Sequence, residues 1–398
     1  MAKNIPRGEP ATQAVGIEIA VIILIGTIPS PLYRLYQEQF GFSTPTLTLI
    51  FSVYVVGALL AMLFLGHLAD QIGRRPVMMA AVVVSALSAA AFIFVRNTVW
   101  LYPPRFISGV AVALAGGAST AWIAGHDPTD DPARATRVAL TYQNVGLALG
   151  SLYAGIIAQW APVAWRLRLP YCVFLILCVP TAVLVWRTPR EIQNPKKLSE
   201  ASFKPSIGLP EGAGLRFAGA AIGAFAVYAV TGFFTALIPT LLGESMHIRS
   251  AAAAGAVVAL FNLANVVILP WRPAMEPRRG VIISLTGLIV GVVALVAAQA
   301  FASLTLLLVS TIIGGLASGL GYRATLQEVN DLSSSENRAK VVSLYMMVLY
   351  LGLSIPVLGV GFLASYAGSL MANATFGLVV IALSLGAIDA ERRMAGSK

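Results

Sequence analysis

The chain has 398 residues, of which 58% are hydrophobic and only 11% are charged, and its mean hydropathy is +0.81. In soluble domains about a quarter of the residues are charged, so this composition excludes a soluble globular protein. The net charge is +10. The position of the basic residues along the chain explains this charge, and no nucleic-acid partner is needed.

Long segments lack Asp, Glu, Lys and Arg altogether, among them 280–322 and 341–388. A helix needs roughly 20 residues to cross the hydrocarbon, so each of these segments holds two spans. Continuous runs of Ala, Gly and Leu favour helices over the alternating strands of a membrane barrel. The sequence therefore predicts an all-α membrane protein with twelve transmembrane helices, at 14–37, 46–66, 77–95, 98–124, 138–160, 169–187, 215–242, 250–270, 280–300, 303–324, 339–365 and 369–388.

The basic residues predict the orientation of these helices. With the N-terminus inside, 21 of the 27 Lys and Arg residues fall in cytoplasmic segments. Positive charge in short loops is retained on the cytoplasmic side. We therefore expect a multi-pass protein of the bacterial cytoplasmic (inner) membrane, with both termini cytoplasmic and anionic membrane lipids around its basic loops. The polar segment 1–13 and the charged first span do not fit a removable signal peptide.

The first predicted helix has two unusual features. Glu18 is the only one of the 17 acidic residues predicted to lie within a span, roughly 7 Å from its cytoplasmic end. Such a carboxyl group can bind and release a proton, although a side chain reaching cytoplasmic water or a loop arginine is the alternative. Further along, Thr27–Tyr33 contains Pro29 and Pro31, which free backbone carbonyls and make this segment a candidate gate or binding segment.

The turn after the second predicted helix carries the most specific motif. Residues 66–75 follow the pattern G-x-L-A-D-x-x-G-R-R and are followed by Pro76. The glycines permit a tight turn, while the aspartate and arginines can bind helix ends or opposite charges. With this motif, its twelve spans and its central loop, the chain resembles the major facilitator superfamily. That resemblance implies a conformational latch formed by Gly66, Asp70, Gly73, Arg74 and Arg75.

The latch motif departs from the family pattern in two places. Gln71 replaces the usual basic residue, and the matching turn at 271–279 has neither glycine nor aspartate. In the family the aspartate holds the start of the eleventh helix, which here follows a possible capping box at Ser333–Glu336. The plainer interpretation of the motif is an ordinary basic cytoplasmic turn.

The fourth predicted helix contains the one embedded base, Arg105. Residues 105–109 match the R-x-x-x-G pattern of the superfamily. An arginine within a span is costly and usually faces a polar cavity, where it would bind an anionic substrate or tune a proton carrier. The alternative is an arginine that extends to the outer headgroups.

The fifth predicted helix resembles the G-x-x-x-G-P-x-x-G-G signature of antiporter branches of the family. The matching residues are Gly146, Gly150 and Gly155, with Ser151 in place of the proline and Ala154 in place of one glycine. Small residues at this spacing also let two helices pack closely, which is sufficient reason for them. The motif therefore favours export over import only slightly.

The chain divides near its middle. Residues 188–214 contain four prolines and many polar residues, and thus predict a cytoplasmic linker between two six-helix bundles, 1–187 and 215–398. Sliding the sequence by 206 residues aligns Ile107, Gly109 and Ala111 with Ile313, Gly315 and Ala317, which supports pseudo-symmetric halves. Duplicated halves are a common way to build a central transport site.

A substrate site in this chain must consist mainly of neutral polar and aromatic side chains. Asn262 and Asn265 share one face of the eighth helix, although they could equally bond a neighbouring helix. Aromatic side chains in spans are more often packing than binding residues. The candidate cavity residues are Thr27, Tyr33, Arg105, Tyr142, Tyr228, Asn262, Asn265, Tyr345 and Tyr350. With one embedded acid and one base, an apolar, cationic or weakly charged solute is expected.

Other classes of function fit the sequence less well. The three histidines lie at loops or helix ends, and no paired carboxylates or metal-ligand spacing occurs, so no enzyme, cofactor or metal site is expected. We expect a monomeric, proton-coupled alternating-access transporter that exports drug-like compounds or metabolites, with Glu18 as the coupling site. The alternatives are a proton symporter that imports a small organic solute and a non-transporting receptor or scaffold derived from a carrier.

Overall fold

The computed structural model describes residues 8–189, 200, 208–209, 214–269, 275–333 and 338–396. Within these ranges the chain contains helices and no strands. The first half comprises α1 (Glu9–Ile23), η1 (Leu24–Gly26), η2 (Ser30–Leu32), α2 (Tyr33–Phe40), α3 (Thr44–Leu65), α4 (Leu68–Ile72), α5 (Arg74–Ile93), η3 (Thr98–Leu101), α6 (Tyr102–His126), α7 (Pro132–Trp160) and α8 (Leu169–Arg187). The second half comprises α9 (Gly214–Ala236), α10 (Ile238–Ser245), α11 (Ala251–Ile268), α12 (Pro277–Ala300), α13 (Leu304–Asp331), α14 (Arg338–Ala367) and α15 (Ser369–Gly396).

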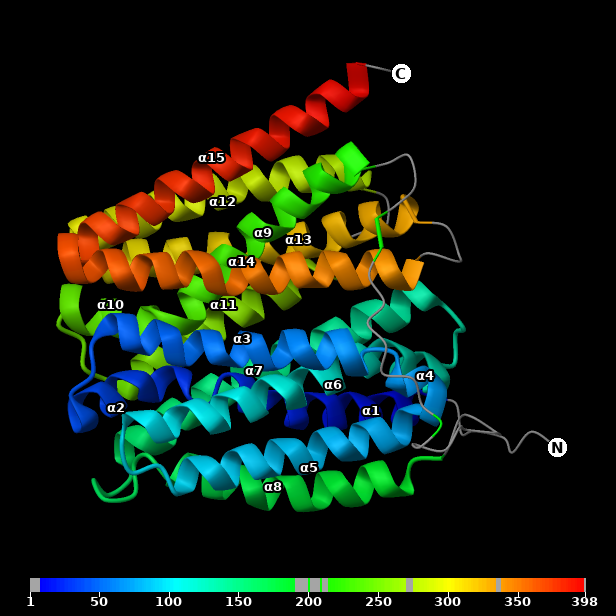
Figure 1. Cartoon of the computed structure of the whole chain (residues 1–398), viewed down its shortest axis with the longest axis horizontal. Helices are drawn as coiled ribbons and strands as arrows, with labels where there is room; N and C mark the ends of the chain where they lie inside the picture. Colours follow the sequence, from blue (N-terminus) through cyan, green and yellow to red (C-terminus); the bar gives the residue numbers. More distant parts are fainter. Residues whose placement is uncertain are drawn as a thin grey trace.

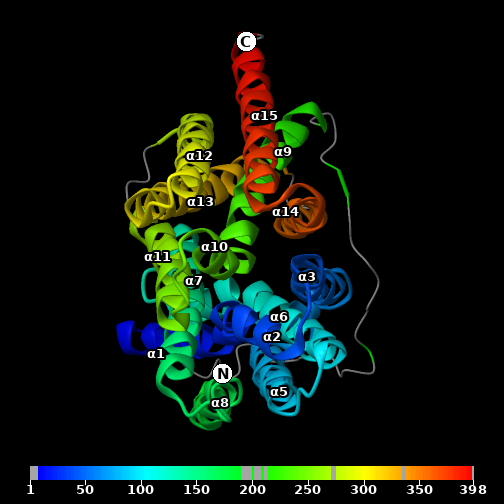
Figure 2. The ribbon, with the colours of Figure 1, turned by 90° about the vertical axis from the view of Figure 1, so that its left-hand side faces the viewer.

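The long helices run side by side along one axis, and the start of α1 and the end of α15 lie at the same end of the molecule (Figure 1). Viewed along this axis, α1–α8 form one bundle and α9–α15 form the other (Figure 2). Most of the predicted linker 188–214, including its four prolines except Pro189, lies outside the described residues. The all-helical, two-bundle prediction is confirmed.

Eleven helical segments of the described chain are long and apolar enough to cross a membrane. The one predicted helix without a counterpart among the eleven is the fifth, at 138–160, which corresponds to α7 and has 29 residues in the structure. Its Arg134, Arg137, Gln143 and Asn144 make it the more polar helix. Its two amides line the central cavity, whereas its two arginines pair with Asp127 and Asp131 near the start of the helix.

The first predicted span, 14–37, is broken in the structure. The α-helix ends at Ile23 and is followed by η1, η2 and the short helix α2. Pro29 and Pro31 cannot donate backbone hydrogen bonds, which prevents a continuous helix through this segment. At its other end the helix begins at Glu9 rather than 14, with a proline in the first turn that favours helix initiation.

Other helix ends also differ from the prediction. The span expected at 215–242 is divided into α9 and α10 next to Pro239, and α13 and α15 continue beyond 324 and 388 to Asp331 and Gly396. Loss of apolar character ends a membrane span but does not end a helix, and the added residues contain no proline. The prediction of 169–187 coincides with α8.

The two bundles touch at the end of the molecule opposite to the chain termini. Gly155 of α7 lies against the backbone of Ala251 at the start of α11, and Gly255 lies against the backbone of Ser151. The side-chain oxygen of Gln159 accepts a hydrogen bond from the backbone N–H of Ala251 at 2.9 Å. In the orientation given by the basic residues this is the outer end, so the space between the bundles is closed there.

Candidate functional site

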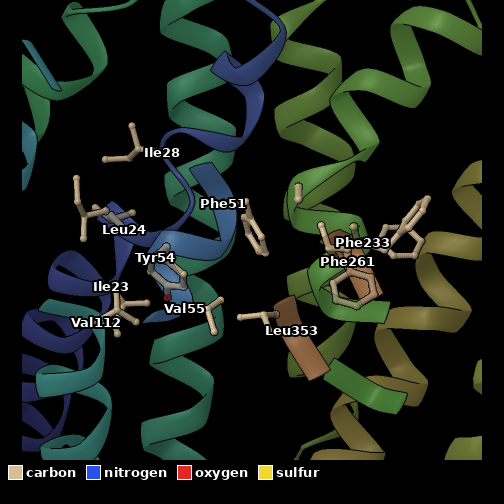
Figure 3. Close-up of a cluster of buried hydrophobic side chains, with 14 of the residues drawn as sticks. Ile23, Leu24, Ile28, Phe51, Tyr54, Val55, Val112, Phe233, Phe261 and Leu353 are labelled. Carbon is tan, nitrogen blue, oxygen red and sulfur yellow. The ribbon is translucent and has the colours of Figure 1, made fainter. Parts of the chain in front are cut away.

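A cavity lies between the two bundles, with a volume of about 1030 Å³ that includes space open to solvent. The broken first helix, α3, α6 and α7 line it from one bundle, and α9, α11, α13 and α14 line it from the other. Figure 3 shows Phe51, Tyr54 and Val112 on one side of this region and Leu353 on the other. Thr27, Tyr228, Asn262, Asn265 and Tyr350, which the sequence placed in the substrate cavity, all belong to its lining.

Amide side chains provide much of the polar surface of the cavity. The Nδ2 groups of Asn144, Asn262 and Asn265 donate to the backbone carbonyl four residues earlier, at 2.8–3.0 Å. Each asparagine therefore keeps its side-chain oxygen available as an acceptor. Gln143 donates to the Ser119 hydroxyl at 2.6 Å. Gln143 and Asn144 were not predicted as cavity residues. Their signal in the sequence is that two adjacent amides lie in the middle of an otherwise apolar span.

No Asp, Glu, Lys, Arg or His is among the described residues that line the cavity. Its ionisable lining groups are the phenols of Tyr54, Tyr228, Tyr322 and Tyr350. Tyrosine is neutral at physiological pH, so the wall of the cavity carries no formal charge. Recognition at this wall depends on apolar contact and hydrogen bonding.

Four of the predicted cavity residues lie outside the lining. The ring of Tyr142 packs against Gly16 of α1. Tyr345 is fully buried, and its hydroxyl shares a hydrogen bond of 2.7 Å with the Thr325 hydroxyl. Tyr33 and Arg105 lie together behind the wall formed by the first bundle.

Arg105 is 0% exposed and does not extend to the outer headgroups. Its Nη1 donates to the backbone carbonyl of Gly26, at 3.2 Å, in the break of the first helix. Its guanidinium carbon lies 4.6 Å from the ring centre of Tyr54 and 5.6 Å from that of Phe51. Because Gly26, Phe51 and Tyr54 all line the cavity, Arg105 is separated from it by a single layer of residues.

Glu18 is also 0% exposed, but it does not line the cavity. The start of α1 at Glu9 places it nine residues, or about 14 Å, along the helix. One carboxyl oxygen accepts a hydrogen bond from Trp122 Nε1 of α6, and the other accepts from the Thr188 hydroxyl just after α8, each at 3.0 Å. Glu18 thus links three parts of the first bundle through neutral donors.

The predicted latch residues surround the short helix α4. Gly73 has a φ of +97°, a left-handed conformation that favours glycine, and it forms the sharp turn into α5. Asp70 is exposed on α4, and the Arg75 guanidinium lies over the Trp186 ring of α8 at 4.9 Å. The expected partner of Asp70 near Ser333–Glu336 and the matching turn at 271–279 fall largely on residues 334–337 and 271–274, outside the described residues.

A polar network joins the end of α6 to the start of α7. Arg134 Nη1 contacts both carboxylate oxygens of Asp127 at 2.8 Å, and Arg134 also pairs with Glu9 of α1. Burial acts to raise the pKa of Asp127. Hydrogen bonds from Thr129 and the charge of Arg134 outweigh burial and hold that pKa below its ordinary value of 3.8. The sequence analysis placed these charges in loops but did not predict their pairing.

The glycines of the fifth predicted helix are packing residues of α7. An added side chain at Gly146 would meet the backbone of Ala20, and one at Gly150 would meet that of Leu24. Gly155, near the end of α7, instead faces the other bundle. The motif therefore brings α7 close to the broken first helix and to α11.

The sequence profile of the Major Facilitator Superfamily matches residues 17–275, well over half of the chain. The chain belongs to the Major Facilitator Superfamily. It is 28% identical over 145 residues to a gallate transporter of Pseudomonas putida, a match that covers 36% of this chain and 30% of that protein. It is 26% identical over 170 residues to the multidrug transporter MdfA of Yersinia pestis, covering 42% and 40% of the two chains. These matches span less than half of the relatives' length.

Solved transporters of this superfamily share the fold over nearly the whole chain. The D-xylose-proton symporter has a TM-score of 0.76 at 15% identity, covering 94% of this chain and 96% of its own. The nucleoside transporter NupG has a TM-score of 0.73 at 12% identity, covering 96% and 99%. This superfamily member therefore has the multi-span helical fold of these transporters, as the sequence predicted.

Proposed function

We propose that this superfamily member is a secondary active transporter that exports a small amphipathic organic molecule across the bacterial cytoplasmic membrane by alternating access. The observation that carries the proposal is the cavity, which both bundles line and which their contacts close at the outer end. Rocking of one bundle against the other would open this end and close the opposite one. The multidrug and gallate transporters among the relatives support a substrate of this size and character.

We propose that protons drive the transport and that Glu18 is the coupling group. A buried carboxylate that has only neutral donors is costly to keep charged, so Glu18 has reason to exchange a proton. Because Glu18 does not reach the cavity, its protonation would act through the packing of α1, α6 and Thr188. Thr188 lies just before the segment that leads to the second bundle, so this junction can influence how the bundles move.

The turn around α4 completes the proposed cycle. In this proposal, Asp70, Arg74 and Arg75 act with Gly66 and Gly73 as a latch that stabilises the outward-facing state. Cytoplasmic termini are part of the same proposal, supported by the common side on which α1 begins and α15 ends. We also propose that the transporter functions as a monomer.

Proteoliposomes with trapped pyranine test the proposal directly. An imposed pH gradient of either direction is combined with benzoate, benzamide or ethidium, and substrate-dependent proton movement is recorded. We expect Glu18→Gln to abolish gradient-driven flux and to retain substrate exchange. Glu38→Gln, at an exposed outer residue, is the matched control and should behave as wild type.

Each result bears on a different part of the proposal. Absence of flux for every probe, in both gradient directions, would refute the transporter proposal and favour a receptor or scaffold. Normal gradient-driven flux in Glu18→Gln would remove Glu18 from the coupling mechanism. Accumulation that requires protons to enter together with the probe would identify an importer.

A further inference from the structure

Arg105 has no counter-ion within the described part of the chain. Its Nη1 is bonded to the Gly26 carbonyl, but its Nε and Nη2 are buried and have no hydrogen-bond partner. The rings of Tyr33, Phe51 and Tyr54 surround the guanidinium and offset only part of the cost of burying its charge. A buried cation with two unused donors is an incomplete site.

The unused donors form the edge of the guanidinium that binds carboxylates. Nε and Nη2 point to the same side of the planar group, where two parallel N–H bonds can reach the two oxygens of one carboxylate. The Tyr33 hydroxyl, on a ring that lies 5.7 Å from the guanidinium carbon, is likewise buried without a partner. Ser30, one turn earlier in the broken helix, has a second unpartnered hydroxyl. All of these groups can donate to an anion.

The surroundings select an organic anion. Lining residues of the cavity contact Arg105, and most of the cavity wall is apolar with several aromatic rings. An inorganic anion would leave this apolar surface without a partner. An organic acid would place its carboxylate at Arg105 and its apolar body in the cavity.

We propose that the substrate carries a carboxylate, which binds the free Nε–Nη2 edge of Arg105 with help from the Tyr33 hydroxyl. This inference rests on the proposed transport function and assigns its substrate class. The side chain of Phe51 or Tyr54 must rotate to let the carboxylate pass, since these rings separate Arg105 from the cavity. The sequence favoured an apolar, cationic or weakly charged solute; this proposal instead selects an anionic one, because Glu18 lies away from the cavity and Arg105 lies next to it.

Matched acid and amide pairs test this inference on the purified full-length protein. Binding is measured by thermal shift and by calorimetry with benzoate and benzamide, indole-3-acetate and indole-3-acetamide, and octanoate and octanamide. We expect acids to bind at least tenfold more tightly than their amides, and chloride and sulfate to have no effect. Arg105→Gln should weaken acid binding tenfold or more and leave amide binding unchanged. Arg96→Gln, at an exposed outer residue, is the control and should match wild type.

Two further variants keep the test decisive if Arg105→Gln does not fold. Tyr33→Phe removes only the hydroxyl and should weaken acid binding about threefold, whereas Arg105→Lys keeps the charge but loses the two-point contact and should retain weak acid binding. Amides binding as tightly as acids, absence of binding by every acid, or wild-type acid binding in folded Arg105→Gln would each overturn the inference. Flux of ethidium without flux of benzoate would overturn the inference while preserving the transport function, whereas acid binding without any flux would refute only transport.

Discussion

Replacing Gly155 by alanine is expected to shift the transporter towards a state that is open at the outer end. The added methyl group would meet the backbone oxygen of Ala251 and the Cα atom of Ala252 across the interface between the bundles. Backbone atoms cannot rotate away as a flexible side chain can, so overpacking of about 1–3 kcal/mol is expected when this end is closed. The gain in helix propensity is the same in both states and cancels in the equilibrium between them.

An energy difference of this size changes the ratio of the two states by roughly 5-fold to 150-fold. A cysteine at Thr235, which lines the cavity, reports the opening through its reaction with a membrane-impermeant maleimide applied from outside. The two native cysteines, Cys172 and Cys178, are first replaced by serine. Gly359→Ala is the matched control, because no atom lies within 4 Å of the position of its added methyl group. Unchanged labelling in Gly155→Ala, or an equal rise in Gly359→Ala, would refute the reasoning.

Three other substitutions probe separate parts of the molecule. Asp127 has a folded-state pKa below 3.8, so its contribution to stability is present above about pH 4 and is lost as the pH falls through the folded-state value. Asp127→Asn should accordingly lower stability by about 1–3 kcal/mol at pH 7 and reduce the acid dependence of the thermal midpoint; an unaltered pH profile would contradict this role. Trp122→Phe removes one of the two donors to Glu18, and we expect a change in the pH dependence of flux, recorded with pyranine, without a change in substrate affinity. Asn262→Ala removes a cavity acceptor and should weaken binding of a donor-bearing substrate roughly 2-fold to 12-fold in calorimetry, whereas unchanged affinity would place Asn262 outside the recognition surface.

The positions of the membrane spans can be predicted from apolar segments, because the free energy of placing a segment in lipid depends on its local composition. These segments predict helix ends less well, since a helix can continue beyond the apolar segment, as α13 does through Glu328 to Asp331. The break in the first helix was expected at Thr27–Tyr33, because the chemistry of proline is local. By contrast, the ion pair between Glu9 at the start of α1 and Arg134 of α7 joins residues far apart in the sequence, and nothing local to either residue indicates it.

Site residues were harder to predict because the face of a helix that meets the cavity is set by packing. Glu18 was expected within its span and Tyr345 in the substrate cavity; the structure buries both, and each bonds to neighbouring parts of its bundle outside the cavity lining. Asn262 and Asn265 were selected for their shared face, and this face does line the cavity. Nothing local to Arg105 indicates that its neighbours are three aromatic rings from Tyr33, Phe51 and Tyr54.

The polarity of α7 has a consequence for how the protein is made. A ribosome-bound chain delivers its helices to the bilayer one after another, and a helix with two arginines and two central amides gains less from lipid than its neighbours do. Gly146 and Gly150 lie against Ala20 and Leu24, so the first helix already offers α7 a surface when it leaves the translocon. Biogenesis of the first bundle should therefore depend on retention of the newly made first helix beside the exit site until α7 arrives.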